Sequence, residues 1–174
     1  MTGAKLLEKL LYSFEGSYDI ERNCDVGGYI YDAYASFNAT SSKYVLIKKA
    51  ELWRADCFEH VLFSVEDRFT EAHIEGLRKA IEEYVEPFLV RGGKRWPEKN
   101  HMYTYMTAIY ICENQVEGAV KKAIRSFRYV KNYKFSIRGY SEARILVFDM
   151  KKGEIFGNSA AKELVKGYKK SGIF

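Results

Sequence analysis

The spacing of apolar residues changes several times along this chain, and these changes constrain its fold more than any other feature. Residues 6–14 carry leucine and phenylalanine three and four positions apart, which is the spacing of one helix face. In residues 29–37 the side chains instead divide into two alternating sets, as in a strand. The chain is therefore expected to contain both helices and strands.

The same two spacings recur further along. Helical spacing is found in residues 70–88, 115–129 and 159–170, and strand-like segments are 43–53, 57–65, 102–112, 134–139, 143–150 and 154–158. We predict that the NATSS stretch, residues 38–42, is a hairpin loop and that residues 55–56 form a short turn. Strands joined by hairpins in the first half and by helices in the second imply a mixed sheet with helices packed on it. The predicted fold class is α/β (mixed α+β), with roughly five to seven strands, an N-terminal hairpin and about four helices.

Length and composition favour one cytoplasmic domain spanning residues 1–174. The start of the chain has the pattern of an amphipathic helix rather than a signal peptide, and no segment approaches the roughly 18 to 20 apolar residues of a membrane span. The three cysteines form no Cys-x-x-Cys pair, which favours a reducing compartment. We expect no membrane partner and no required cofactor. The net charge of +5 permits an anionic partner.

A carboxylate, Asp32, lies in the middle of the segment GGYIYDAYASF. If the first hairpin turns near residues 40 and 41, Asp32 faces Lys48 or Lys49 on the returning strand. Such a pair has two interpretations. It is either a cross-strand ion pair that helps to fix the register, or part of a catalytic site.

The catalytic interpretation comes from a resemblance to the restriction-endonuclease-like nucleases, whose signature is an Asp followed by Glu-x-Lys on the next strand. The resemblance implies that Asp32 is the first carboxylate and Lys49 the lysine that orients or deprotonates the attacking water. Ile47 occupies the position of the glutamate, so Glu51 or Glu59 would have to replace it. Only under this alternative would Mg2+ or Mn2+ be a cofactor, held by Asp32 and Glu51.

The sequence more closely resembles an uncharacterised prokaryotic family of small single-domain proteins. The segments that carry the resemblance are YDIERN, GGYIYDAYASF, KYVLIKKAELW, FEHVLF and RSFRYVKNYKFSIRGYSEARILVFDMKKGEIFGNSAAKEL, which together cover most of the chain. This resemblance implies no activity and no ligand.

A second candidate site is the stretch KKAIRSFRYVKNYKFSIR, which has many cations and no acid. Its cations are Lys121, Lys122, Arg125, Arg128, Lys131, Lys134 and Arg138. In a helix, Lys121, Arg125 and Arg128 share one face, and aromatic residues are interleaved with the cations. Such a face would attract phosphate groups, and exposed aromatic rings would stack on bases. The alternative is a solvated helix face whose aromatic rings point into the core.

His60 alternates with Phe58 and Leu62 and thus lies on an otherwise apolar strand face. We expect it to be a hydrogen-bonded core residue. The alternative is a catalytic pair with Cys57 or Cys112.

These features favour a non-catalytic binding or accessory protein with a basic surface for an anionic partner, nucleic acid or another polyanion. The first alternative is a metal-dependent nuclease on the restriction-endonuclease-like core. The second is an interaction domain that self-associates through aromatic sheet edges, as in a homodimer.

Overall fold

The computed structural model describes the backbone of residues 1–45 and 50–174, and the side chains of these residues except those of 40–45 and 50–54. The elements in chain order are α1 (Gly3–Phe14), β1 (Asp19–Val26), β2 (Tyr29–Val45), β3 (Ala50–Glu66), α2 (Glu71–Ala80), the π-helix η1 (Ile81–Val90), β4 (His101–Cys112), α3 (Gly118–Ser126), β5 (Val130–Asn132), β6 (Tyr140–Asp149), β7 (Glu154–Gly157), the 3-10 helix η2 (Ser159–Ala161) and α4 (Lys162–Ser171).

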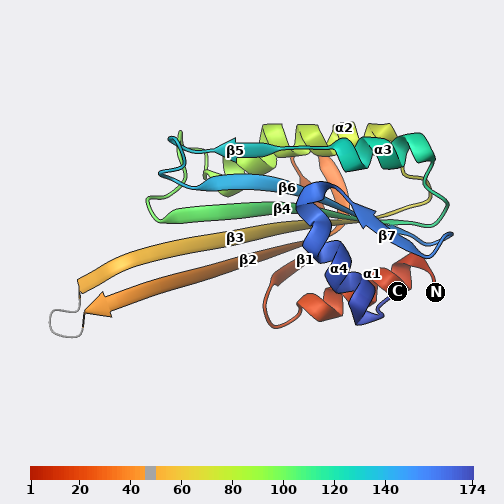
Figure 1. Ribbon diagram of the computed structural model, residues 1–174, viewed down its shortest axis with the longest axis horizontal. Coiled ribbons are helices and arrows are strands. Elements are labelled where there is room, and N and C mark those ends of the chain that lie inside the picture. The colour runs from red at the N-terminus through yellow and green to blue at the C-terminus, as the bar shows by residue number, and fades with distance from the viewer. Residues whose placement is uncertain (46–49) are drawn as a thin grey trace.

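These strands form one mixed sheet of seven strands, in the order β1-β2-β3-β4-β6-β5, with β7 also paired to β6 (Figure 1). Strands β3, β4 and β6 are parallel to one another, and every other pairing is antiparallel. The parallel strands are connected through α2 and η1 and then through α3, as parallel pairs require. The predicted mixed α+β class, with its N-terminal hairpin, is confirmed.

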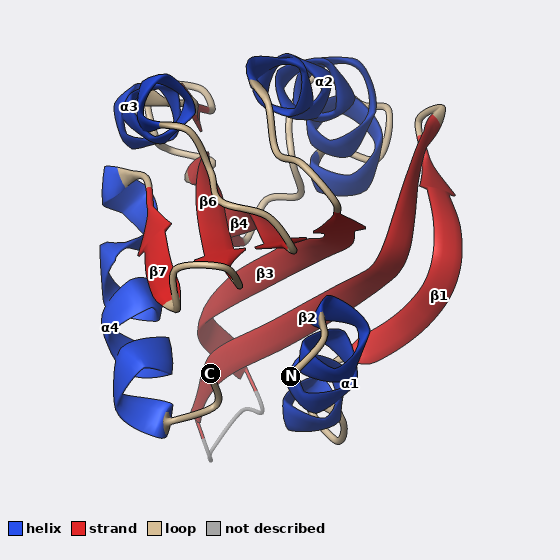
Figure 2. Cartoon of the chain, turned by 90° about the vertical axis from the view of Figure 1, so that its right-hand side faces the viewer, coloured by secondary structure: helices blue, strands red, loops and turns tan. Residues whose placement is uncertain are grey.

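Helices cover both faces of this sheet. Figure 2 shows α2 and α3 above it, α1 beneath it and α4 beside β7. The apolar residues divide accordingly into two clusters. One contains Leu77 of α2 and Ile124 of α3, and the other contains Leu6 and Leu10 of α1. Within the described part of the chain, no helix is both long and apolar enough to cross a membrane.

The expected hairpin loop at residues 38–42 is wrong. Residues 38–42 lie inside β2, where they pair with residues 54–58 of β3, and the expected turn at residues 55–56 is also continuous strand. The backbone hydrogen bonds of a long antiparallel ladder outweigh the turn preference of a short polar stretch. The first hairpin is instead β1 with β2, which turns at Gly27 and Gly28.

The expected strand at residues 134–139 is a turn. Lys134, Phe135 and Ser136 have positive φ angles of 49°, 53° and 65°, which is left-handed backbone and incompatible with a strand. The strand that pairs with β6 comes earlier, as β5, and this turn returns the chain at Gly139. Phe135 at the turn is 97% exposed.

The long helix predicted over residues 70–88 has a change of form inside it. Regular α-helix ends at Ala80, and the wider π-helix from Ile81 to Val90 contains Pro87. Proline lacks the N–H that a regular helix needs at an interior position. The widened segment is therefore where the helix accommodates this proline.

Candidate anion-binding groove

Asp32, the first carboxylate of the nuclease interpretation, contacts the backbone rather than a lysine. Its Oδ2 accepts a hydrogen bond of 2.7 Å from the N–H of Val65 in β3. The register of β2 and β3 pairs Ala33 with Phe63. The expected position of Asp32 opposite Lys48 or Lys49 is therefore wrong, because the strands fold back farther along the chain than predicted.

Of the other proposed catalytic residues, only the side chain of Glu59 is described, and it lies far from Asp32. Lys49 lies outside the described residues, as does the side chain of Glu51. Glu59 lies six residues before Val65 on β3, about 20 Å away at ~3.3 Å per residue. Among the described residues, no three His, Cys, Asp or Glu side chains are grouped so that they would hold a metal ion.

Glu59 has partners of its own on the sheet face that carries α1. Its carboxylate accepts hydrogen bonds of 2.7 Å from the hydroxyl groups of Tyr18 and Thr107. Arg144 approaches the same carboxylate at 3.8 Å and lies over the ring of Tyr105. Burial and the Glu59 hydrogen bond raise the pKa of Tyr18 well above its usual value.

Two cations of the basic stretch neutralise buried carboxylates. Lys121 contacts Glu154 and lies 3.5 Å from Asp149. Lys131 lies 2.9 Å from Glu86, whose side chain is only 2% exposed. Each of these lysines is thus paired with carboxylates of the chain itself.

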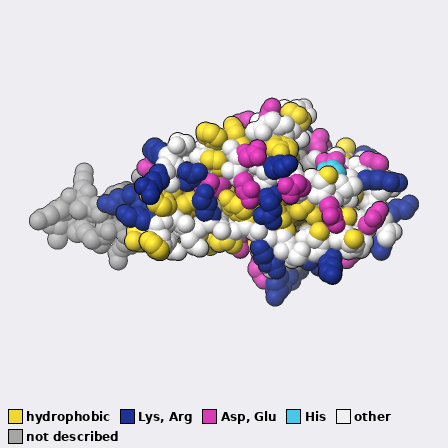
Figure 3. Space-filling view, turned by 90° about the horizontal axis from the view of Figure 1, so that it is seen from above, with side chains coloured by type: hydrophobic (Ala, Val, Ile, Leu, Met, Phe, Trp, Pro, Cys, Tyr) yellow, Lys and Arg dark blue, Asp and Glu magenta, His cyan; other side chains and the backbone are white. Residues whose placement is uncertain are grey.

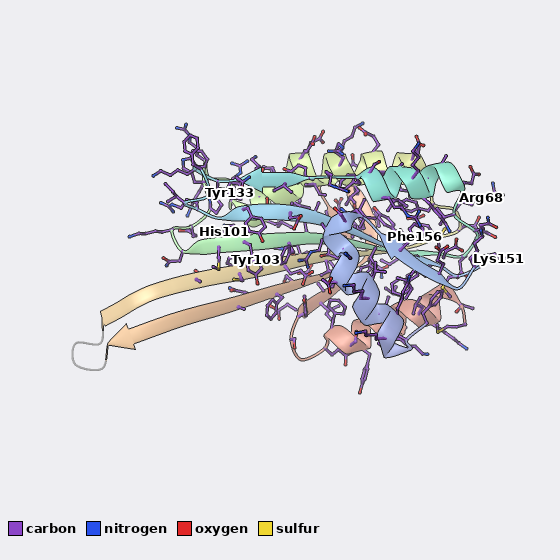
Figure 4. All side chains as sticks on the ribbon, in the orientation of Figure 1. Arg68, His101, Tyr103, Tyr133, Lys151 and Phe156 are labelled. Carbon is purple, nitrogen blue, oxygen red and sulfur yellow. The ribbon has the colours of Figure 1, made fainter. Side chains whose placement is uncertain are left out.

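The remaining cations of the stretch do not form one surface. Lys122, Arg125 and Arg128 are exposed on or just after α3, whereas Lys134 lies in the left-handed turn and Arg138 bonds to the Pro97 carbonyl. Lys121 lies over the ring of Phe156, and Figure 4 shows Phe156 near α4 and Tyr133, the residue before Lys134, toward the other end of the sheet. Seen from the side of α2 and α3, basic and acidic side chains intermix over much of the surface (Figure 3).

The interleaved aromatic residues give little support for base stacking at α3. Phe127 and Tyr133 are buried, and Tyr129 is half-buried. Burial raises the pKa of Tyr129 to about 12. The fully exposed ring of the stretch, Phe135, belongs to the distant turn.

Arg125 nevertheless lies on a groove that gathers additional cations. A cavity of about 510 Å³ is bounded by the end of α3, by β7 and by one face of α4. Lys162, Lys166 and Lys169 line it from α4, at the spacing of four and three that places residues on one helix face. Figure 2 shows α3 above β7 and α4 beside it, the arrangement that brings these cations together.

The cations that line the groove outnumber the acids near it. Glu154 lines the groove as a carboxylate: the hydrogen bond from Lys121, which also lies beside Asp149, and the charge of Arg125 lower its pKa. Lys166 pairs with Glu163 at 2.8 Å. Arg125, Lys162 and Lys169 make no ion pair with any described carboxylate. An anion in this groove would meet four lining cations, Arg125, Lys162, Lys166 and Lys169, against one lining carboxylate, Glu154.

The sequence interpretation missed the lysines of α4. They were assigned to a terminal helix, yet their spacing within KELVKGYKK already placed them on one face. What the sequence did not contain was the packing of α4 beside β7, which places this face opposite Arg125.

Comparison with known proteins adds a family but no activity. No curated protein and no solved structure matches the chain. A family model described as a domain of unknown function, DUF8052, matches residues 2–170. Since this match covers nearly the whole chain, the protein belongs to the DUF8052 family.

Proposed function

We propose that this protein is a non-catalytic binding protein that holds a polyanion, with nucleic acid as the first candidate, in the groove between α3, β7 and α4. The observation that carries the proposal is the convergence of Arg125, Lys162 and Lys169 on one groove, where none of the three forms an ion pair with a described carboxylate. Unmatched cations at this spacing attract phosphate groups and release the counterions bound to them.

The chemistry of the groove favours contact with a phosphate backbone over contact with bases. Its aromatic residue, Phe156, is 5% exposed, and Lys121 lies over its ring, so that it offers no free face for stacking. Binding is therefore expected to depend weakly on nucleotide sequence and strongly on salt. A domain that only self-associates would not bind nucleic acid and so would show no salt-dependent binding of this kind.

The experiment measures the affinity of the purified protein for fluorescently labelled single-stranded and double-stranded oligonucleotides over a range of salt concentrations. The test variant combines Arg125→Ala, Lys162→Ala and Lys169→Ala. We expect it to weaken binding at least roughly tenfold at low salt and to lower the slope of log affinity against log salt by about 2 to 3.

A matched variant separates the groove from net charge. Lys5→Ala, Lys9→Ala and Lys79→Ala together remove the same charge from exposed positions outside the groove. This variant should bind within about twofold of the unmodified protein. Equal weakening by both variants, or no binding to either oligonucleotide, would overturn the proposal.

A further inference from the structure

A second cavity lies on the opposite side of the molecule from α4, where β2 separates from β3. The β2–β3 ladder ends at Ala33 and Phe63, so that residues 29–31 pair with β1 alone. A pocket of about 270 Å³ opens there, covered by α2. Its polar lining comes from Ser64, Glu66 and His73, and its aromatic lining from Tyr29, Tyr31 and Tyr110.

Glu66 supplies the pocket with a negative charge. Ser64 donates its hydroxyl to Glu66 Oε1, and His73 Nε2 lies 3.3 Å from Glu66 Oε2. Within the described part of the chain, no lysine or arginine forms an ion pair with this carboxylate.

The two ring nitrogens of His73 have different partners. The backbone N–H of Thr70 donates to His73 Nδ1 at 3.0 Å, which requires a lone pair on that nitrogen. His73 Nε2 is the ring nitrogen that faces Glu66.

The rings around Glu66 are suited to a positive ligand. Tyr31 and Tyr110 are 5% and 3% exposed, and their hydroxyl groups hydrogen-bond to each other. Burial raises the pKa of Tyr31 to about 12, so these rings stay neutral. Tyrosine faces attract cations, most strongly organic ammonium groups that shed water easily. We propose that this pocket binds a small alkylammonium ligand, whose charge meets Glu66 and whose methyl or methylene groups contact the tyrosine rings.

Gly76 provides the room for such a ligand. It lies inside α2 and lines the pocket, and a Cβ built there would be 3.5 Å from the Tyr29 ring. Glycine inside a helix costs about 1 kcal/mol relative to alanine. A larger branched residue at this position would extend past Tyr29 into the cavity.

The test compares two probes of equal shape that differ in charge. Choline carries a quaternary ammonium group, and its neutral carbon isostere has carbon in place of the nitrogen. Binding to the intact protein is followed by amide chemical shifts in NMR titrations. We expect saturable shifts with choline and affinity for the isostere that is weaker by roughly tenfold or more.

Three variants locate the binding. Glu66→Gln keeps the shape but removes the charge, and should weaken choline binding by roughly tenfold or more. Gly76→Val leaves Glu66 in place and should abolish binding by filling the pocket. Glu75→Gln, at an exposed position on the same helix and outside the pocket, should leave affinity unchanged. Equal affinity for the two probes, absence of saturable binding, or full affinity in Gly76→Val would each overturn the proposal.

Discussion

Asp32 accepts the backbone N–H of Val65 at the point where the ladder between β2 and β3 ends. On the N-terminal side of Ala33, the backbone of β2 no longer pairs with β3. There the Asp32 carboxylate accepts the Val65 N–H in place of a backbone carbonyl of β2. The regular alternation of side chains in β2 is also interrupted here. Residues two positions apart in a strand normally share a face, yet Tyr31 belongs to the cluster on the α2 face and Ala33 to the cluster on the α1 face. The charge inside a strand is therefore explained by backbone hydrogen bonding at a strand separation.

The first prediction concerns this contact. Asp32→Ala should lower the free energy of unfolding by about 1 to 3 kcal/mol, because it leaves the Val65 N–H without its acceptor. Asp32→Asn keeps an oxygen acceptor and should cost less than about 1 kcal/mol. Urea unfolding measures both. Cleavage of DNA that depends on Mg2+ or Mn2+ and is lost in Asp32→Asn would instead support the nuclease alternative.

The second prediction separates structural from accessible cations in the basic stretch. Lys131→Met removes a cation from the half-exposed ion pair with Glu86 and should lower the free energy of unfolding by about 1 to 2 kcal/mol, with Arg91 still bound to that carboxylate. Its affinity for oligonucleotides should stay within about twofold. Arg125→Ala should have the opposite effects. Its free energy of unfolding should stay within about 0.5 kcal/mol of that of the unmodified protein, and its affinity for oligonucleotides should be lower. Loss of binding in Lys131→Met at unchanged stability would contradict this division.

The third prediction is a pH dependence of stability set by His60. Burial lowers its pKa from 6.5 to about 4 in the folded protein. As the pH falls from 6.5 to 4, His60 therefore becomes protonated in the unfolded chain but stays neutral in the folded protein. The stability linked to His60 is complete above pH 6.5 and is lost toward pH 4, by about 3 kcal/mol in all.

His60→Gln provides the comparison, since glutamine does not titrate. The difference in unfolding free energy between the two proteins should change by about 3 kcal/mol between pH 7 and pH 4. Urea unfolding at a series of pH values measures this difference, and groups common to both proteins cancel from it. A difference that stays constant over this range would show that His60 titrates normally.

The sequence predicted the elements better than their pairing. The apolar run at residues 102–112 is β4, as expected, and His60 is a partly buried residue that is hydrogen-bonded to the hydroxyl of Tyr34. The prediction of a turn at residues 38–42 was wrong because turn preference depends only on local sequence. The pairing of these residues with residues 54–58 depends on the whole sheet. Local patterns fix the period of a segment but not which segment pairs with it.

The candidate groove was only partly predictable for the same reason. The charge of the basic stretch is visible in the sequence, but the acids that neutralise two of its lysines are distant in the chain. Glu86 and Glu154 meet Lys131 and Lys121 only after folding. The lysines of α4 lie opposite Arg125 because of tertiary packing. A single sequence does not contain these distances.

The last prediction uses one chemical change at two glycines. Gly139 has a φ of +71°, and a Cβ there would lie 2.0 Å from the carbonyl oxygen of Met102. Gly139→Ala should therefore lower the free energy of unfolding by more than about 2 kcal/mol, from left-handed strain and displacement of β4.

Gly167 lies inside α4, and a Cβ there would meet no atom within 4 Å. Gly167→Ala should stabilise the protein by about 0.5 to 1 kcal/mol, because alanine loses less backbone entropy in a helix. Thermal unfolding should show a lower midpoint for Gly139→Ala and a midpoint roughly 1 to 4 °C higher for Gly167→Ala. Shifts of the same sign would contradict either the close approach of Gly139 to β4 or the open position of Gly167, and urea unfolding of each variant would identify which.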